Sequence, residues 1–325
     1  MKMPIQPSSS ANEKDAMLSN IALLYYGEGL TQSEIAKRFK VSRVTIVNML
    51  RDCRERGVVE IRVDGKLLAG SSLSRQLKEK FGLADVYISS ESAETTQADR
   101  AGQLPQLARV AAMAMMDIVE TGDRVGVAWG ETIAAMASAM PRAMVENIEV
   151  CQLIGSQESD RVPASEFCAI EVANKLGATC HTLHAPGIVS SPELARAFAQ
   201  EPAIKAQLAR LSALDFTVAS IGNVADSTHM VAAKIATAAE LAAARAAGAV
   251  GIICCRYIDA RGQEVTIAPS DRVIAASCAD LTRPAKKLLV VFGEDRLEAT
   301  RAAIQGGFVS HLVIDHSLGA ALLAS

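Results

Sequence analysis

Short apolar runs alternate with long alanine-rich stretches over most of the 325-residue chain. Each run is rich in β-branched residues and has the length of a buried strand, whereas stretches such as residues 104–120 and 230–248 have the composition of helices. The apolar runs are residues 84–89, 123–129, 148–155, 215–222, 287–293 and 311–315. Strands in alternation with helices form a parallel sheet with helices on both faces. The sequence therefore predicts an α/β domain with a mostly parallel sheet.

The N-terminal part of the chain follows a different, helical pattern. Residues 1–12 are rich in proline and serine and offer little to bury, so we expect them to be disordered. Apolar residues at helical spacing predict a helix from Glu13 to about Gly27, a short helix from Thr31 and another over residues 42–56. Three helices in so short a segment predict a small all-α domain.

The junction between the two patterns is polar. A β-branched run at residues 58–63 suits a strand, and Asp64 with Gly65 offers a turn after it. A serine-rich stretch at residues 70–74 reads as a connection. We therefore expect a helix-turn-helix domain over residues 13–65 and a larger ligand-binding and oligomerisation domain over residues 66–325.

The second and third predicted helices have the features of a helix-turn-helix. Thr31 is a good N-cap, and Glu34 three residues later completes a capping box. Ser42 caps the next helix, and Ala36 is small enough to lie where two helices touch. Lys40 stands at the turn position where glycine is commonest, because glycine adopts a positive φ without steric cost.

The third helix allows two buried stripes. One consists of Val44, Val47 and Leu50, and the other of Ile46 and Leu50. Both leave polar and basic side chains outside, where arginine suits guanine edges and asparagine suits adenine. The residues expected to face outward are Ser42, Arg43, Thr45, Asn48, Met49 and Arg51.

Basic charge is concentrated in this segment. Residues 37–56 contain seven basic and two acidic residues, although the whole chain has a net charge of -3. A solvated amphipathic helix pair has a similar composition, but the caps, the small contact residue and the charge together favour a reader of double-stranded DNA. The predicted DNA contacts are Thr31, Gln32, Lys37, Arg38, Ser42, Arg43, Thr45, Asn48, Arg51 and Arg54.

Composition excludes several other classes of protein. The seven cysteines are an odd number without CxxC spacing, which indicates reduced thiols and a cytoplasmic protein. No signal-peptide core and no apolar run long enough to span a membrane is present in the sequence, so we expect no membrane partner.

Three predicted strands end in glycine-bearing turns. Gly130, Glu131 and Thr132 follow one strand, and residues 220–224 and 292–296 end two others. The carboxyl ends of parallel strands share one edge of a sheet, where α/β proteins bind ligands. Any one glycine can simply let the chain turn, but three together indicate a ligand site.

Catalytic and metal-binding patterns are weak. The sequence contains neither a GxSxG elbow nor an HExxH motif, so we expect no catalytic residue. If the segment from Cys180 to His184 were a strand, these two residues would share a face and His181 would oppose them, which leaves too few ligands for a metal. His229 and His316 follow strand ends, where lone histidines are usually ordinary polar groups. We therefore predict neither a metal nor another cofactor.

Taken in order, these motifs resemble the SorC family of bacterial sugar-responsive transcriptional regulators. The resemblance covers nearly the whole chain. It rests on SEIAKRFKVSRVTIVNMLR, VGVAWGETI, CQLIGS, LHAPGIVSSPE, LDFTVASIGN, AAGAVGIICCRYIDARGQEV, SDRVIAAS and GEDRLEATRAAIQGGFVSHLVID. It implies a larger domain with a fold like that of sugar-phosphate isomerases but without turnover, a small sugar, polyol or sugar-phosphate effector, and a dimer or tetramer.

The same resemblance implies an effector site, and this chain differs from the usual family residues at two positions. The implied effector contacts are Gly130, Glu131, Thr132, Gly155, Ser156, Gly222, Asn223, Gly293 and Arg296. Family members usually carry an acidic residue where this chain has Ile252, and a lysine where it has Arg296. Arginine still binds a phosphate, so anion binding survives the second change. An isomerase-type enzyme with an accessory helical domain, and a protein-interaction adaptor, are the alternatives.

Overall fold

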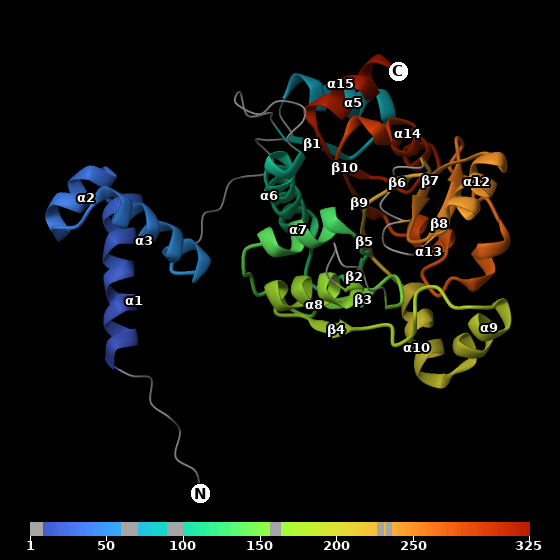
Figure 1. Ribbon diagram of the computed structural model, residues 1–325, viewed down its shortest axis with the longest axis horizontal. Helices are drawn as coiled ribbons and strands as arrows, with labels where there is room; N and C mark the ends of the chain where they lie inside the picture. The colour runs from blue at the N-terminus through green and yellow to red at the C-terminus, as the bar shows by residue number, and fades with distance from the viewer. Residues whose placement is uncertain (1–8, 60–70, 90–99, 157–163, 226–230, 232–235) are drawn as a thin grey trace, which may run out of the picture. The chain divides into compact units, whose positions relative to one another are not determined.

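The chain forms two compact units, residues 1–63 and 64–325 (Figure 1). The computed structural model describes residues 9–59, 71–89, 100–156, 164–225, 231 and 236–325. Each unit has its own apolar core and is described by itself.

Three α-helices make up the described part of the N-terminal unit. They are α1 (Ser9–Ala22), which continues into a π-helical turn (Leu23–Gly27), α2 (Gln32–Phe39) and α3 (Arg43–Glu55). Ile21, Ile35, Ile46 and Leu50 form its core, one or more from each helix. The first helix starts at Ser9, before the expected start, so residues 9–12 are helical rather than disordered.

The junction differs from its sequence-based expectation. Most of the strand predicted at residues 58–63, and the turn after it, lies outside the described residues, while Val58 and Val59 form a bend. The serine-rich stretch is not a connection, because Ser71 caps helix α5 (Ser72–Phe81) by accepting a hydrogen bond from the backbone of Ser74 at 3.0 Å.

A seven-stranded parallel sheet forms the centre of the C-terminal unit, in the order β1-β10-β9-β5-β2-β3-β4. All six apolar runs of the alternating pattern supply strands to it, so the expectation of a mostly parallel α/β domain is confirmed. The strands are β1 (Asp85–Ser89), β2 (Arg124–Val127), β3 (Glu149–Gln152), β4 (Thr179–His181), β5 (Phe216–Ala219), β9 (Lys286–Val291) and β10 (His311–Asp315).

Helices cover both faces of this sheet (Figure 1). Successive side chains of β9 alternate between two cores: Leu288 and Val290 belong to one, and Leu289 and Val291 to the other. The first core contains residues of α6 (Arg100–Ile118), α7 (Glu131–Ala139) and α8 (Ser165–Leu176). The second contains residues of α5, α12 (Ala238–Ala246), α14 (Leu297–Gln305) and α15 (His316–Ala324).

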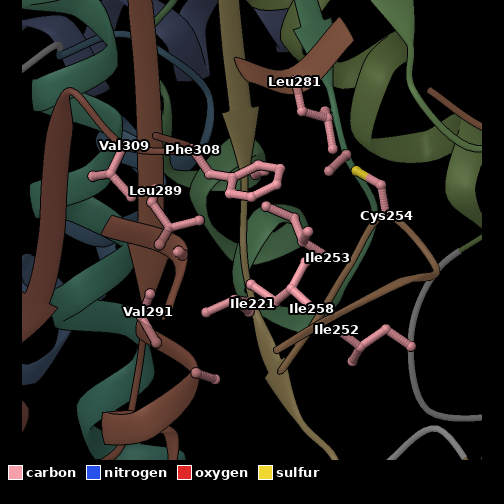
Figure 2. Close-up of a cluster of buried hydrophobic side chains, with 14 of the residues drawn as sticks. Ile221, Ile252, Ile253, Cys254, Ile258, Leu281, Leu289, Val291, Phe308 and Val309 are labelled. Atoms are coloured by element: carbon pink, nitrogen blue, oxygen red, sulfur yellow. The ribbon is translucent and has the colours of Figure 1, made fainter. Parts of the chain in front are cut away.

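A small antiparallel sheet packs beside the second core, and the sequence did not predict it. It consists of β6 (Gly222–Asn223), β7 (Ala249–Ile253) and β8 (Arg256–Asp259). Figure 2 shows Ile253 and Ile258 of this sheet facing Leu289 and Val291 of the large one. The remaining helices are α9 (Pro192–Gln200), α10 (Pro202–Leu211), α13 (Cys278–Thr282), and the single turns η2 (Ala268–Arg272) and η3 (Glu294–Arg296).

The stretch predicted as one helix is interrupted at Ala236 and Thr237, which are not helical. Of the alanine-rich stretch 230–248, the helix α12 occupies Ala238–Ala246, and much of the preceding segment lies outside the described residues. Thr237 sets this start, because its hydroxyl accepts a hydrogen bond from the backbone N–H of Glu240 at 3.2 Å, in a capping box.

The order of the large sheet reverses between two neighbouring strands. From β2 the chain continues to β3 and β4 on one side, whereas from β5 the next strands of this sheet, β9 and β10, lie on the other side. In open α/β sheets such a reversal leaves a crevice at the carboxyl ends of the two strands, because the segments that follow them diverge. Residues 128–130 and 220–222 follow these two ends.

Candidate functional site

The N-terminal unit has the geometry of a helix-turn-helix. Thr31 and Glu34 form the predicted capping box: the Glu34 carboxylate accepts the Thr31 backbone N–H at 2.8 Å, and Thr31 Oγ1 accepts the Glu34 backbone N–H at 3.3 Å. Ser42 caps α3 in the same way, with its Oγ accepting the backbone N–H of Thr45 at 3.0 Å. Both helices therefore start where the sequence predicts.

The turn between these helices is tight and left-handed. Lys40 has φ 55° and ψ 40°, and the backbone N–H of Val41 donates to the carbonyl oxygen of Ala36 at 3.0 Å. A lysine thus adopts the conformation that glycine adopts at lower cost. The turn therefore keeps its left-handed geometry although lysine replaces the more common glycine.

Helix α3 buries the narrower of the two stripes that its sequence allows. Ile46, Leu50 and Cys53 are buried, whereas Val44 is 67% exposed and Val47 is 42% exposed. The alternative stripe with Val44 and Val47 is therefore wrong. Met49, which we expected to face outward, is half-buried against the core, because it lies beside that stripe.

Most of the predicted DNA contacts are exposed, while Gln32 is half-buried. Arg43 Nε donates to Gln32 Oε1 at 3.2 Å, so the side chain from α2 orients the arginine at the start of α3. The acidic residues of the basic segment have nearby cations of their own, Asp52 at 3.9 Å from Lys14 and Glu55 at 3.7 Å from Arg51. The exposed residues among the predicted contacts are Thr31, Lys37, Arg38, Ser42, Arg43, Thr45, Asn48, Arg51 and Arg54.

A pocket lies in the C-terminal unit where the order of the large sheet reverses. Residues after β2, residues after β5 and the β7–β8 hairpin enclose it, and Arg296 from η3 completes it. Its lining consists of Trp129, Gly130, Glu131, Thr132, Ile154, Ser220, Ile221, Gly222, Ile252, Cys254, Cys255 and Arg296. A ligand there would meet polar groups of the loop after β2 and apolar side chains of the small sheet.

The polar side of this pocket includes the start of helix α7. Gly130 occupies the N-cap position with φ 146° and makes no side-chain cap, since it has no side chain. The first backbone N–H groups of a helix need acceptors and carry the positive end of the helix dipole. They can therefore bind a phosphate, a carboxylate or a hydroxyl oxygen.

Arg296 is held in place by its own turn. Its Nη1 donates to the carbonyl oxygen of Phe292 at 2.6 Å and to Asp295 Oδ1 at 3.1 Å, and its side chain is 12% exposed. A guanidinium stays positively charged and presents a planar set of N–H groups, which suits an anion better than a neutral ligand. The positive charge of Arg296 and the dipole of α7 make this end of the pocket suited to an anionic group.

Five of the nine implied effector residues line this pocket: Gly130, Glu131, Thr132, Gly222 and Arg296. The other four lie nearby with identifiable partners. An added Cβ on Gly155 would lie 2.4 Å from the Ala185 carbonyl oxygen, and the Ser156 hydroxyl donates to Glu166. Asn223 Nδ2 donates to Asp295 Oδ2 at 2.9 Å, and the Gly293 N–H donates to Asp315 Oδ2 at 2.6 Å. In this structure the four residues contact neighbouring residues of the protein.

The Cys254–Cys255 turn is a pocket wall that the sequence did not single out. These two residues join β7 to β8 with φ 47° and 61°, a hairpin turn that usually contains asparagine or glycine. Burial raises the pKa of both thiols, so they are neutral groups. The signal available in the sequence was two apolar runs separated by two residues, without the usual turn residues.

His181, His184 and His316 are not among the residues that line the pocket. Strand β4 ends at His181, so strand alternation does not extend to His184, whose Nε2 lies 3.1 Å from Thr182 Oγ1. His181 Nε2 lies 3.8 Å from Glu149, and burial lowers the pKa of His181. His316 is exposed at the start of α15, and His229 lies outside the described residues.

No helix in the described part of the chain combines the length and the apolar character that crossing a bilayer requires.

Comparison with known proteins yields a family and a fold. A family model of a sugar-binding domain matches residues 66–324. The chain is 32% identical to the transcriptional regulator YjhU of Escherichia coli K12 over 320 residues, which are 98% of this chain and 97% of that protein. It is 28% identical to the deoxyribonucleoside regulator of Bacillus subtilis 168 over 312 residues, 96% and 98% of the two chains.

A solved structure has the same fold over nearly the whole chain. The full-length sorbitol operon regulator SorC from Klebsiella pneumoniae matches with a TM-score of 0.73 at 23% identity, covering 95% of this chain and 99% of that one. At so low an identity the likeness concerns the arrangement of the elements and not the ligand.

Proposed function

The chain belongs to the SorC family of transcriptional regulators, and from this premise we propose that it controls a carbohydrate or polyol operon by binding double-stranded operator DNA through α2 and α3. A small sugar, polyol or sugar phosphate in the pocket of the C-terminal unit changes that binding. The protein acts in the cytoplasm and performs no chemistry on its effector.

One observation carries the proposal: the pocket that contains the uncapped start of α7 and Arg296 lies where the order of the sheet reverses. This is the position at which α/β folds bind ligands, and its groups suit an anion beside hydroxyl groups. The same chain presents a capped, basic helix pair, which supports the proposal that one polypeptide combines a sensor with a DNA reader.

We expect the regulator to act as a homo-oligomer, a dimer or a tetramer. A symmetric oligomer presents two helix-turn-helix units to a palindromic operator whose half-sites are spaced by whole turns of DNA. An effector then changes DNA affinity only to the extent that it binds one arrangement of the subunits more tightly than another. The mass of the protein in solution, measured with and without operator DNA, tests this expectation.

The function is tested by ligand screening followed by DNA binding. Purified full-length protein is screened with sugars, polyols and their phosphates for thermal stabilisation, since a ligand that binds the native state raises the melting temperature. Each hit is then added to gel-retardation assays with DNA selected by the protein from a random library. The expected result is at least one hit that changes the retarded fraction, and a hit that stabilises without any such change counts against the proposal.

The enzyme alternative is tested with the same compounds. Glu131 is the one carboxylate among the described residues that line the pocket, and no histidine lines it there. A sugar isomerase needs a positioned acid or base to move a proton between carbon atoms. Release of an isomerised product from any of these ligands would replace the regulator proposal with the enzyme.

A further inference from the structure

Helix α3 has two exposed valines, Val44 and Val47, that contribute little to the core of the N-terminal unit. Val44 is 67% exposed and Val47 is 42% exposed, while Ile46 and Leu50 of the same helix supply its buried contacts. Valine is a poorer helix former than the polar residues common on helix surfaces. Neither packing nor helix propensity therefore explains these two side chains.

Their position connects them to the predicted base-reading residues. Val44 and Val47 are three residues apart, so they lie on one face of the helix. Asn48 follows Val44 by four residues and Arg51 follows Val47 by four, so both lie on that same face. Val44 is the second residue of α3 after the Ser42 cap. In a helix-turn-helix, residues near the start of the second helix contact base edges.

The positive charge around the two valines favours a negatively charged partner. Lys37, Arg38, Arg43 and Arg51 are all exposed in this segment. A surface that covers the two valines must therefore be apolar where it meets them and negatively charged around them. The major groove of DNA has this combination, because each thymine presents a C5-methyl group between rows of phosphates.

We infer that Val44 and Val47 contact thymine methyl groups and so help to select the operator sequence. This inference rests on the proposed binding of DNA by α2 and α3. The two valines would add thymine to the bases read by Arg43 and Asn48. Each half-site would then contain at least one thymine whose methyl group is required for full affinity.

The test removes single methyl groups from the DNA. Operator fragments are obtained by selection from a random duplex library with the full-length protein, and each thymine is replaced in turn by uracil, which lacks only the C5-methyl group. Losing contact with one buried methyl group costs about fourfold in affinity. We expect such a loss at one or two positions in each half-site.

Protein variants then assign the methyl groups to side chains. Val44→Ala binds the thymine operator less tightly and no longer distinguishes uracil at one position, and Val47→Ala behaves in the same way at another. Leu23→Ala is the matched control, because Leu23 is 60% exposed in the same unit but lies in the π-helical turn before α2. It should retain the full uracil response.

The outcomes separate this inference from the proposed function. If the protein selects and binds DNA but uracil changes its affinity less than twofold at every position, the inference is wrong and the DNA-binding function stands. If the protein binds no DNA, both are wrong. If Val44→Ala and Val47→Ala keep the uracil response of the unaltered protein, or instead change the mass of the DNA-free oligomer, the valines meet another surface and the inference also fails.

Discussion

Helix α3 of the N-terminal unit and helix α7 of the C-terminal unit both begin at a proposed ligand surface, but their first turns are completed differently. The Ser42 side chain caps α3, whereas Gly130 leaves α7 without a side-chain cap. The Ser42 side chain satisfies the Thr45 N–H in the first turn of α3, and the exposed groups of this turn that can meet a partner include its side chains. The first turn of α7 offers its backbone N–H groups.

This difference matches the two kinds of ligand. Reading a base sequence requires side chains of distinct shape on a helix whose position does not depend on the DNA. Binding a small anion requires several N–H donors at one point, which an uncapped helix start supplies without any side chain. We therefore expect substitutions in the core and caps of the N-terminal unit to act on its stability, those of exposed α3 side chains to act on DNA binding, and those in the pocket to act on the effector.

The largest effect should come from the core of the N-terminal unit. Ile46→Ala removes a fully buried side chain and should lower the free energy of unfolding of this unit by about 2–4 kcal/mol. Hydrogen exchange of the α3 amides in the full-length protein measures this change. Val44→Ala, at an exposed position of the same helix, is the control and should change it by less than about 0.5 kcal/mol. Equal effects would show that α3 gains its stability from outside its own core.

The next effect concerns the pocket and should leave the N-terminal unit unchanged. Arg296→Ala removes the guanidinium and should weaken binding of a phosphorylated effector by about 10- to 100-fold, since hydrogen bonds to charged groups contribute about 1.5–3 kcal/mol. Titration calorimetry measures the affinity, and DNA binding without effector should stay constant. Arg301→Ala removes an exposed arginine of α14 outside the pocket and should change neither. An Arg296→Ala protein with unchanged effector affinity would move the anion site elsewhere.

The two regions also differ in how far their sequences predict them. The parallel sheet followed from the alternation of apolar runs, and the caps at Thr31 and Ser42 from short-range rules, because both patterns report on local geometry. The stripe on α3 stayed ambiguous, since valine and isoleucine both fit a core. Only tertiary packing selects Ile46 over Val44 and Val47.

The pocket was predicted only in part. The turn at Gly130 could be found because a glycine follows an apolar strand, and its conformation requires glycine. The β7–β8 hairpin was missed because cysteines occupy a turn that normally contains asparagine or glycine. The surroundings of Gly155 depend on a backbone segment thirty residues later, at Ala185, and no local pattern reports such a contact.

A smaller effect tests the caps. Ser42→Ala removes the acceptor for the Thr45 backbone N–H and should lower the stability of α3 by about 1 kcal/mol. The same hydrogen-exchange measurement detects it, and DNA affinity should fall with it because the first turn of α3 frays. Ser191→Ala, which removes the corresponding cap of α9 in the other unit, should leave the exchange of α3 unchanged. A Ser42→Ala protein with unaltered α3 exchange would mean that the cap contributes little in this helix.

The smallest predicted effect is a gain in stability, and it compares two helix ends with the same backbone conformation. Lys40 and Gly82 end helices α2 and α5 in the same left-handed conformation, with φ 55° and 63°. Lys40→Gly should stabilise the N-terminal unit by about 0.5 kcal/mol, because glycine adopts this conformation without steric cost but loses more entropy on folding. Gly82→Lys should destabilise the other unit by a similar amount, because lysine adopts this left-handed conformation at a cost. The cost should be no larger, because an added Cβ at this position meets no atom outside its chain neighbours within 4 Å. Both changes are measured by hydrogen exchange of the helix that precedes the turn.

Lys40→Gly also tests the predicted DNA surface. Lys40 is exposed within the basic segment but lies outside the set of predicted contacts. If it stands clear of the phosphates, the slope of DNA affinity against salt concentration stays the same when its charge is removed. A slope that falls by about one would place a phosphate at the turn itself, because each lost phosphate contact lowers the number of released counterions. The DNA interface would then extend from the start of α3 across the turn, and Lys40 would join the predicted phosphate contacts.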